Sequence, residues 1–110
     1  MADLATNSDT NCIWLHYARP RPHWYLTEEA VKQELTRRWQ DIRADAGANG
    51  ATFQGRFHIR GQHDFETVDV WRFPGSQAAY DHWQALVEAR YSEFFAFSNN
   101  IGLAMGGEAE

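Results

Sequence analysis

Three stretches of the chain alternate apolar and polar residues with the period of two that a β-strand requires. They cover residues 12–18, 51–60 and 65–73, and the last two flank the polar turn sequence GQHD. A short fourth strand is expected within FFAFSNNIGLA, after a last helical turn. Between these stretches the apolar spacing changes to three and four residues, which predicts helices.

Two amphipathic helices are predicted. Apolar residues of the first follow at spacings of four, four, three and four, at Val31, Leu35, Trp39, Ile42 and Ala46. Thr27 is its expected N-cap, Leu26 and Val31 should form a hydrophobic staple, and GANG should end it. The second helix should start after the Pro-Gly-Ser at 74–76 and run toward Tyr91. Its expected buried stripe is Ala79, Trp83, Leu86 and Val87.

The order strand, helix, strand, strand, helix, strand is that of the ferredoxin-like α+β fold. Two helices can cover only one face of its antiparallel sheet, so the other face needs a partner or water. We expect a single domain over residues 12–102, with flexible tails at 1–11 and 103–110. The length of 110 residues suits one domain with its own core.

The register that GQHD sets divides the strand residues between two faces. One face is apolar and should lie under the helices: Ile13, Leu15, Tyr17, Phe53, Gly55, Phe57, Ile59, Val68 and Val70. The other mixes two tryptophans with titratable groups: Trp14, His16, Ala18, Gln54, Arg56, His58, Arg60, Thr67, Asp69 and Trp71. Strand one should lie beside strand three, which brings His16 close to Thr67 and Asp69. Polar groups with aromatic walls are typical of a small-molecule pocket.

Composition narrows the function classes. The chain has 15 acidic and 10 basic residues, and this balance argues against nucleic-acid binding. Its apolar runs are too short to cross a membrane and the N-terminus lacks a signal-peptide pattern, so a cytoplasmic protein is expected. The single cysteine, Cys12, also favours a reducing compartment. Five Trp, four Tyr and seven Phe indicate a large aromatic core or an aromatic pocket.

The strand end WRFP with the helix after it, and then ARYSEFFAFSNNIG, resemble the dimeric α+β barrel superfamily. Three motifs resemble one family of that fold more closely: YARPRPHWYLTEE, the strand end VWRFP at 70–74, and the aromatic then Asn-rich segment 91–102. Over about residues 12–102 the chain is most similar to a small uncharacterised bacterial family of that fold. The resemblance implies a homodimer with two sheet faces packed together, helices outside, and a pocket in each protomer. Superfamily members include polyketide cyclases, muconolactone-type isomerases, cofactor-free monooxygenases and haem enzymes, so the fold alone does not choose the chemistry.

The polar face suggests acid–base catalysis on a small molecule. His16 and His58 are candidate proton acceptors, which Asp69 could orient. Arg56 or Arg60 could bind a carboxylate or stabilise an enolate, although Arg56 and Asp69 could equally form a cross-strand pair. The expected substrate-binding residues are Trp14, Trp24, Tyr25, Arg56, Arg60, Thr67, Trp71 and Asn99.

The preferred hypothesis is a homodimeric isomerase, cyclase or lyase that needs no cofactor and acts on an aromatic or unsaturated molecule. A cofactor-free or haem-type monooxygenase and a non-catalytic ligand-binding or structural dimer are the alternatives. No metal site is expected, because His16, His58 and Asp69 lie on three strands without ligand spacing. No histidine carries a haem motif. His82 is expected on the exposed face of the second helix.

Overall fold

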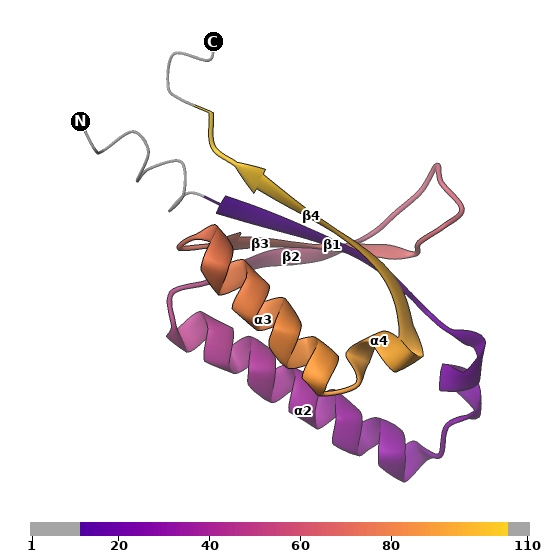
Figure 1. The fold of residues 1–110 in the computed structure, drawn as a ribbon. Helices are drawn as coiled ribbons and strands as arrows, with labels where there is room; N and C mark the ends of the chain where they lie inside the picture. Colours follow the sequence, from indigo (N-terminus) through magenta and orange to yellow (C-terminus); the bar gives the residue numbers. More distant parts are fainter. Residues whose placement is uncertain (1–11, 106–110) are drawn as a thin grey trace.

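The computed structural model describes residues 12–105 and has the predicted order of elements (Figure 1). The strands are β1 (Cys12–Pro20), β2 (Thr52–His58), β3 (Thr67–Phe73) and β4 (Phe95–Leu103). The helices are α2 (Glu29–Ala48), α3 (Ser76–Glu88) and the short α4 (Tyr91–Phe94), and a 3-10 turn at Pro22–Leu26 follows β1. Of the predicted tails, residues 1–11 and 106–110 lie outside the described part, whereas Leu103 belongs to β4.

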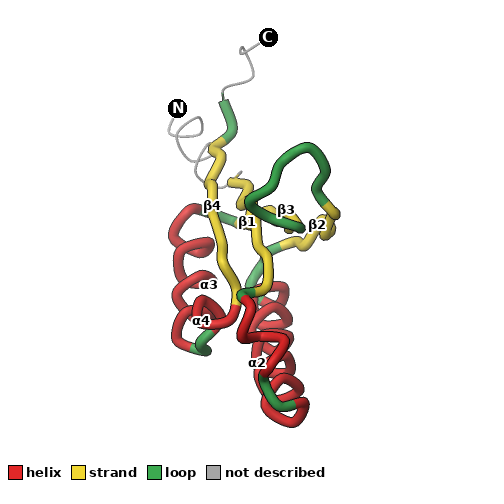
Figure 2. Tube along the Cα trace, turned by 90° about the vertical axis from the view of Figure 1, so that its right-hand side faces the viewer, coloured by secondary structure: helices red, strands yellow, loops and turns green. Residues whose placement is uncertain are grey.

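The four strands form one antiparallel sheet in the order β2-β3-β1-β4. Strand β1 lies beside β3, as predicted, and His16 is directly opposite Asp69. All three helices lie on the same side of this sheet (Figure 2). The predicted ferredoxin-like α+β fold is therefore confirmed. None of the helices in the described residues has the length and apolar character that a membrane span needs.

The helices cover the face that the sequence pattern assigned to the pocket. Trp14 and Trp71 are each 2% exposed and belong to the core, whereas Phe57 on the opposite face is 53% exposed. The prediction that Phe57 and its neighbours lie under the helices is therefore wrong. Alternation tells which residues share a face, but the hand of the β-α-β crossover decides which face the helices take.

A β-bulge in β2 also changes the predicted register. Phe53, rather than Gln54, pairs with Trp71, and Gly55 pairs with Val70 as predicted. Gly55 has a φ of 147°, a backbone conformation that a residue with a Cβ rarely adopts. The extra residue moves Phe53 to the helix side, where its ring centroid lies 5.0 Å from that of Trp71.

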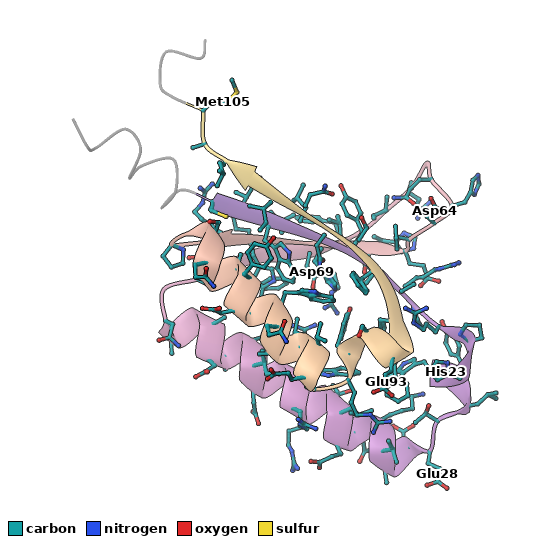
Figure 3. The ribbon with its side chains drawn as sticks, viewed as in Figure 1. His23, Glu28, Asp64, Asp69, Glu93 and Met105 are labelled. Carbon is teal, nitrogen blue, oxygen red and sulfur yellow. The ribbon has the colours of Figure 1, made fainter. Side chains whose placement is uncertain are left out.

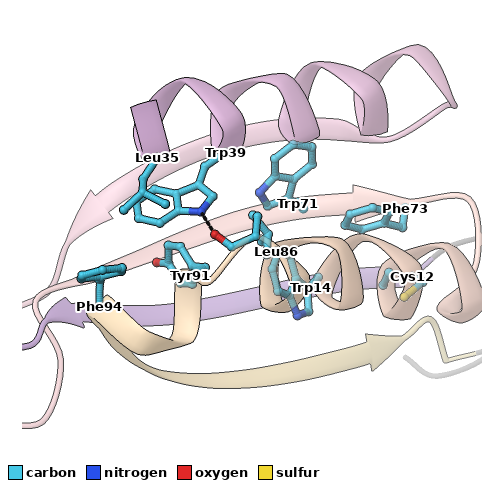
Figure 4. Close-up of a cluster of buried hydrophobic side chains, with 11 residues drawn as sticks. Cys12, Trp14, Leu35, Trp39, Trp71, Phe73, Leu86, Tyr91 and Phe94 are labelled. Carbon is cyan, nitrogen blue, oxygen red and sulfur yellow. Dashed lines mark hydrogen bonds between the residues drawn. The ribbon is translucent and has the colours of Figure 1, made fainter. Parts of the chain in front are cut away.

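The core lies between the helices and the sheet (Figure 4). Leu35 and Trp39 of the predicted α2 stripe are buried, and the Trp39 Nε1–H donates a hydrogen bond of 3.0 Å to the Ala89 carbonyl. This bond joins α2 to the end of α3. The predicted staple is wrong, because Leu26 and Val31 are both exposed. Glu28, not Thr27, precedes the first helical residue.

The break between α3 and α4 places an aromatic residue in the core. Helix α3 ends at Glu88, and Arg90 adopts a left-handed φ of 70°. The chain then begins α4 at Tyr91, which is buried. Strand β4 starts at Phe95, so it includes the whole Asn-rich segment.

Candidate functional site

The centre of the candidate site is a buried histidine with two hydrogen-bond partners from distant parts of the chain. His16 Nδ1 lies 2.6 Å from Asn99 Oδ1 on β4, and His16 Nε2 lies 2.9 Å from the Tyr91 hydroxyl on α4. An amide oxygen can only accept, so the His16 Nδ1–H donates to Asn99. The unprotonated Nε2 therefore accepts the Tyr91 O–H, and the three side chains form one directed hydrogen-bond chain.

Burial sets the protonation of this chain. It lowers the pKa of His16 below its usual 6.5, although the hydrogen bond to Asn99 and the charge of Asp69 both act to raise it. Burial also raises the pKa of the Tyr91 hydroxyl. At neutral pH, His16 is therefore a neutral imidazole with a lone pair on Nε2, and Tyr91 keeps its proton.

An ion pair links this buried chain to the surface. Asp69, which lies between the sheet and the helices (Figure 3), is opposite His16 on one side and Arg56 on the other. Arg56 Nε and Nη2 donate to the two Asp69 carboxylate oxygens over 2.7 and 3.0 Å. The Asp69 side chain is 4% exposed and that of Arg56 is 49% exposed. The predicted cross-strand pair thus exists and runs from the solvent to the interior.

A second guanidinium group lies near this pair. Arg43 is half-buried on α2, one turn after Trp39, and is close enough for its charge to act on Arg56 and Asp69. Burial lowers the pKa of Arg43, and the like charge of Arg56 adds to that effect. The charges of two cationic side chains therefore act on one carboxylate here, and the sum of the three charges is positive.

Aromatic rings surround His16. The Trp14 ring stacks on the imidazole at a centroid distance of 4.9 Å, and the Trp83 ring lies 5.5 Å away. Trp71 lies farther along the sheet, beside His82 at 5.1 Å. Trp14 and Trp71 thus form walls around buried polar groups, on the helix-covered side of the sheet rather than on its open face.

The structure does not bring all the predicted site residues together. His58 and Arg60 are exposed, at and beyond the end of β2, and Thr67 lies opposite His58. Trp24 packs on Trp39, with 5.6 Å between ring centroids. Tyr25 is exposed and lines a surface groove formed with Arg19, Arg21 and His23. Only Trp14, His16, Arg56, Asp69, Trp71 and Asn99 belong to, or border, the buried cluster.

Sequence reasoning missed three residues of this region: Arg43, His82 and Tyr91. The prediction that His82 is exposed is wrong, because it is 6% exposed. Its spacing could have shown this, since it lies three residues after Ala79 and four before Leu86 on the buried stripe. Arg43 likewise follows Trp39 by four residues. Tyr91 carries no such signal, because its inward position depends on the turn at Arg90.

A separate cavity of about 220 Å³ lies between the C-terminal half of α2 and the N-terminal half of α3. His82 lines this cavity, as do Asp45 and Asp81. The described residues hold no cluster of three or more His, Cys, Asp or Glu that could bind a metal ion.

A haem group, the alternative raised by the sequence, does not fit the cavity between α2 and α3. A haem is larger than a drug-sized ligand, which already needs a pocket of roughly 300 to 1,000 Å³. Asp45 and Asp81 would repel the haem propionates at the cavity. Both ring nitrogens of His16 are already hydrogen-bonded, so neither is available as an axial ligand.

Comparison with known proteins found no matching protein-family model and no similar curated protein. Among solved structures, a candidate chlorite dismutase superimposes with a TM-score of 0.66 and 18% identity, over 91% of this chain and 48% of its own. A haem-binding protein from Thermus thermophilus superimposes with a TM-score of 0.73 and 8% identity, over 93% of this chain and 43% of its own. A VAO-type flavoprotein from Myceliophthora thermophila superimposes with a TM-score of 0.50 and 15% identity, over 87% of this chain and 18% of its own.

The chain spans about half the length of the first two of these proteins. At such low identities the likeness concerns the fold and not the activity. The closer resemblance to a small bacterial family with a VWRFP strand end stays a prediction. The chain thus has a ferredoxin-like α+β fold, which is similar to the fold of the candidate chlorite dismutase and of the haem-binding protein.

Proposed function

We propose that this protein is a homodimeric enzyme that isomerises a small unsaturated organic molecule by acid–base chemistry, without a cofactor. The hydrogen-bond chain from Tyr91 through His16 to Asn99 is the observation that carries the proposal. It offers a neutral base, a hydroxyl that can pass on a proton, and a fixed tautomer. Titratable groups whose pKa is shifted by burial and by named charged neighbours are enriched at catalytic sites.

The proposed reaction begins with removal of a proton from a substrate carbon next to a carbonyl group. That proton binds the Tyr91 oxygen while the Tyr91 proton moves to His16 Nε2. The substrate is then an enolate and His16 an imidazolium. Arg43 and Arg56 stabilise the enolate, and Asp69 stabilises the imidazolium. Reversal of the two transfers, with the proton delivered to a different carbon, completes an isomerisation that needs no oxidant or reductant.

The substrate would enter beside Arg56. This side chain is half-exposed on the edge strand β2, and its partner Asp69 is buried. The guanidinium of Arg43 lies on α2 on the same side of the site. The positive charge of these two groups would orient a carbonyl or carboxylate oxygen of the substrate.

The open face of the sheet supports the proposed homodimer. It presents Ile13, Leu15, Tyr17, Phe57, Val68 and Val70, and none of the helices within residues 12–105 covers it (Figure 1). Arg72, Ser98 and Asn100 also lie on this face, but most of its residues are apolar, which is typical of a protein interface. A second copy of the chain offers the same apolar face with the same twist, which suits a symmetric interface.

Deuterium exchange tests the proposed chemistry even before the substrate is identified. A panel of small α,β-unsaturated ketones is incubated with the protein in D₂O, and loss of the signals from exchangeable protons is followed by ¹H NMR. Y91F should reduce the exchange rate by a factor of about 10² to 10⁴. Y80F is the matched control, because Tyr80 is exposed on α3 and should leave the rate unchanged.

Two outcomes would contradict this function. One is the absence of exchange across the panel, and the other is an equal rate in Y91F and Y80F. The fold-level likeness to a haem-binding protein supports the haem-type alternative. A visible absorbance band of the purified protein, lost in a histidine variant, would favour that alternative instead.

A further inference from the structure

Strand β4 is an edge strand, and one of its two sides has no neighbouring strand. It pairs with β1 on the other side only (Figure 2). Alternate residues of an antiparallel strand direct their N–H and C=O groups to opposite sides, so half of the β4 backbone groups point away from β1. No other strand within residues 12–105 pairs with these groups. A row of unpaired backbone groups of this kind can accept a further strand.

The sequence of β4 does not protect this edge. Proteins usually guard an edge strand with charged side chains, with proline or with a bulge. None of the nine residues of β4, FAFSNNIGL, is charged or a proline, and the register with β1 runs along the whole strand without a shift. The other edge strand, β2, has a bulge between Phe53 and Gly55 and carries the half-exposed Arg56. The edge of β4 is therefore the one that suits pairing.

An exposed apolar strip follows the same strand. Phe97, Ile101 and Leu103 pair with buried residues of β1, so their side chains lie on the helix side of the sheet. They are nevertheless 37%, 38% and 52% exposed, which means that the helices do not fully cover β4. A strand that added to this edge would cover apolar side chains as well as backbone groups.

We infer that β4 pairs with β4 of a second copy of this chain, in antiparallel orientation about Asn99. Asn99 is the middle residue of the strand. Pairing about it sets Phe97 opposite Ile101 of the second copy and Phe95 opposite Leu103, all on the helix side. The edge is thus complementary to itself. Each copy has one such edge, so the pairing stops at two partners.

The side chain of Asn99 also suits this arrangement. Its Oδ1 accepts from His16, whereas its Nδ2 has no hydrogen-bond partner among residues 12–105. In the pair, each Nδ2 would donate to Asn99 Oδ1 of the other copy, because an amide oxygen has two lone pairs and His16 uses one. The two hydrogen-bond chains of the two copies would then meet at the centre of the interface.

The contact is small, so the association should be weak. Stable protein interfaces bury roughly 1,200 to 2,000 Å² in total, and two single strands with three exposed apolar side chains each offer less. The edge contact is separate from the open face of the sheet, and it depends neither on the homodimer proposed above nor on the proposed reaction.

Sedimentation velocity of the full chain tests the pairing, over concentrations from about 10 μM to about 1 mM, because a small interface forms only at high concentration. The sedimenting mass should double over this range, whichever species is present at the low end. Amide hydrogen exchange then locates the contact. Alternate amides of β4 should exchange about tenfold more slowly when nine-tenths of the chains are paired, and those of β2 should not change.

Three variants connect the association to this edge. I101K and L103K each add a charge at an exposed position of β4, and the sedimenting mass should then stay at its 10 μM value throughout. Q54K is the matched control, because it adds the same charge at an exposed position of the other edge strand, β2. Its mass should double as in the unmodified chain.

Three results would overturn the inference. They are a constant mass up to the highest concentration, a mass that still doubles in both I101K and L103K, and slowed amide exchange in β2 instead of β4. If I101K lost the circular dichroism spectrum of the folded protein, L103K and the amide exchange of the unmodified chain would still decide the question.

Discussion

His16 Nδ1 lies 2.6 Å from Asn99 Oδ1, and the two residues stand directly opposite each other in the register of β1 and β4. The bond therefore joins a central strand to an edge strand through side chains as well as through the backbone. Because the Asn99 oxygen can only accept, the bond also determines which nitrogen of His16 carries the proton. The tautomer that Tyr91 meets thus depends on a residue 83 positions farther along the chain.

Replacing Asn99 by Asp should raise the pKa of His16. A carboxylate keeps the acceptor at the same position and adds a negative charge that favours the imidazolium form. NMR titration of the His16 ring signals measures the change. N100D is the matched control, because Asn100 pairs with Leu15 on the open face of the sheet. Equal His16 pKa values in N99D and N100D would contradict the proposed hydrogen-bond chain.

Breaking the Arg56–Asp69 pair should destabilise the protein. R56M leaves the buried Asp69 carboxylate without its bidentate donor, and we expect a loss of about 2 kcal/mol in the free energy of unfolding, because the half-exposed Arg56 makes this pair weaker than a fully buried one. Urea denaturation measures the loss. R56M combined with D69N should recover part of it, since the second change removes the unpaired charge.

The Arg90–Glu93 pair supplies a control for that experiment. Its side chains are about half-exposed, and R90M should change the stability little or not at all. If R56M and R90M have the same small effect, the Arg56–Asp69 pair does not hold the buried carboxylate in the way that its geometry indicates.

Much of the arrangement of His16, Arg56 and Asp69 was predictable from the alternation of apolar and polar residues and from the GQHD turn. The GQHD turn sets the pairing of Arg56 with Asp69, and the usual strand order of the fold brings His16 beside Asp69, as observed. The side of the sheet that the helices cover was not predictable in this way. Polarity suggested that the helices cover the apolar face. Trp14 and Trp71 bury large apolar areas, however, and they lie on the same face as His16 and Asp69.

Two other features depend on backbone geometry that residue patterns do not encode. The bulge at β2 requires the positive φ of Gly55, and alternation alone predicts an unbroken register there. The turn at Arg90 places Tyr91 against His16. A non-glycine residue in the left-handed region has no clear sequence signature, so the third member of the hydrogen-bond chain could not be found from spacing.

The protein should become less stable as the pH falls from about 6.5 toward 4. Burial lowers the pKa of His82 to about 4 and also lowers that of His16, whereas both are near 6.5 in the unfolded chain. Between these pKa values the unfolded chain binds more protons than the folded protein, so the free energy of unfolding decreases with falling pH. For His82 the full effect is about 3 kcal/mol at most.

Urea denaturation between pH 4 and pH 7.5 measures this dependence. H82F should flatten the slope, because Phe cannot bind a proton, and H63F should leave it as it is. If the slope is identical in the unmodified protein, H82F and H63F, protonation of His82 does not contribute to the pH dependence of stability in this range.

A charge on the open sheet face should separate the proposed homodimer into monomers. L15E places a carboxylate at the centre of the apolar face, where residue 15 pairs with Val70 of the neighbouring strand. Dimer formation would bury this carboxylate without a partner. Sedimentation velocity at micromolar concentration should show a dimer for the unmodified chain and a monomer for L15E. The control Y80E adds the same charge on the exposed side of α3 and should stay dimeric. This face would be excluded as the interface if the unmodified chain were a monomer, or if L15E sedimented as a dimer like the unmodified chain. If L15E lost the circular dichroism spectrum of the folded protein, the milder L15T would replace it.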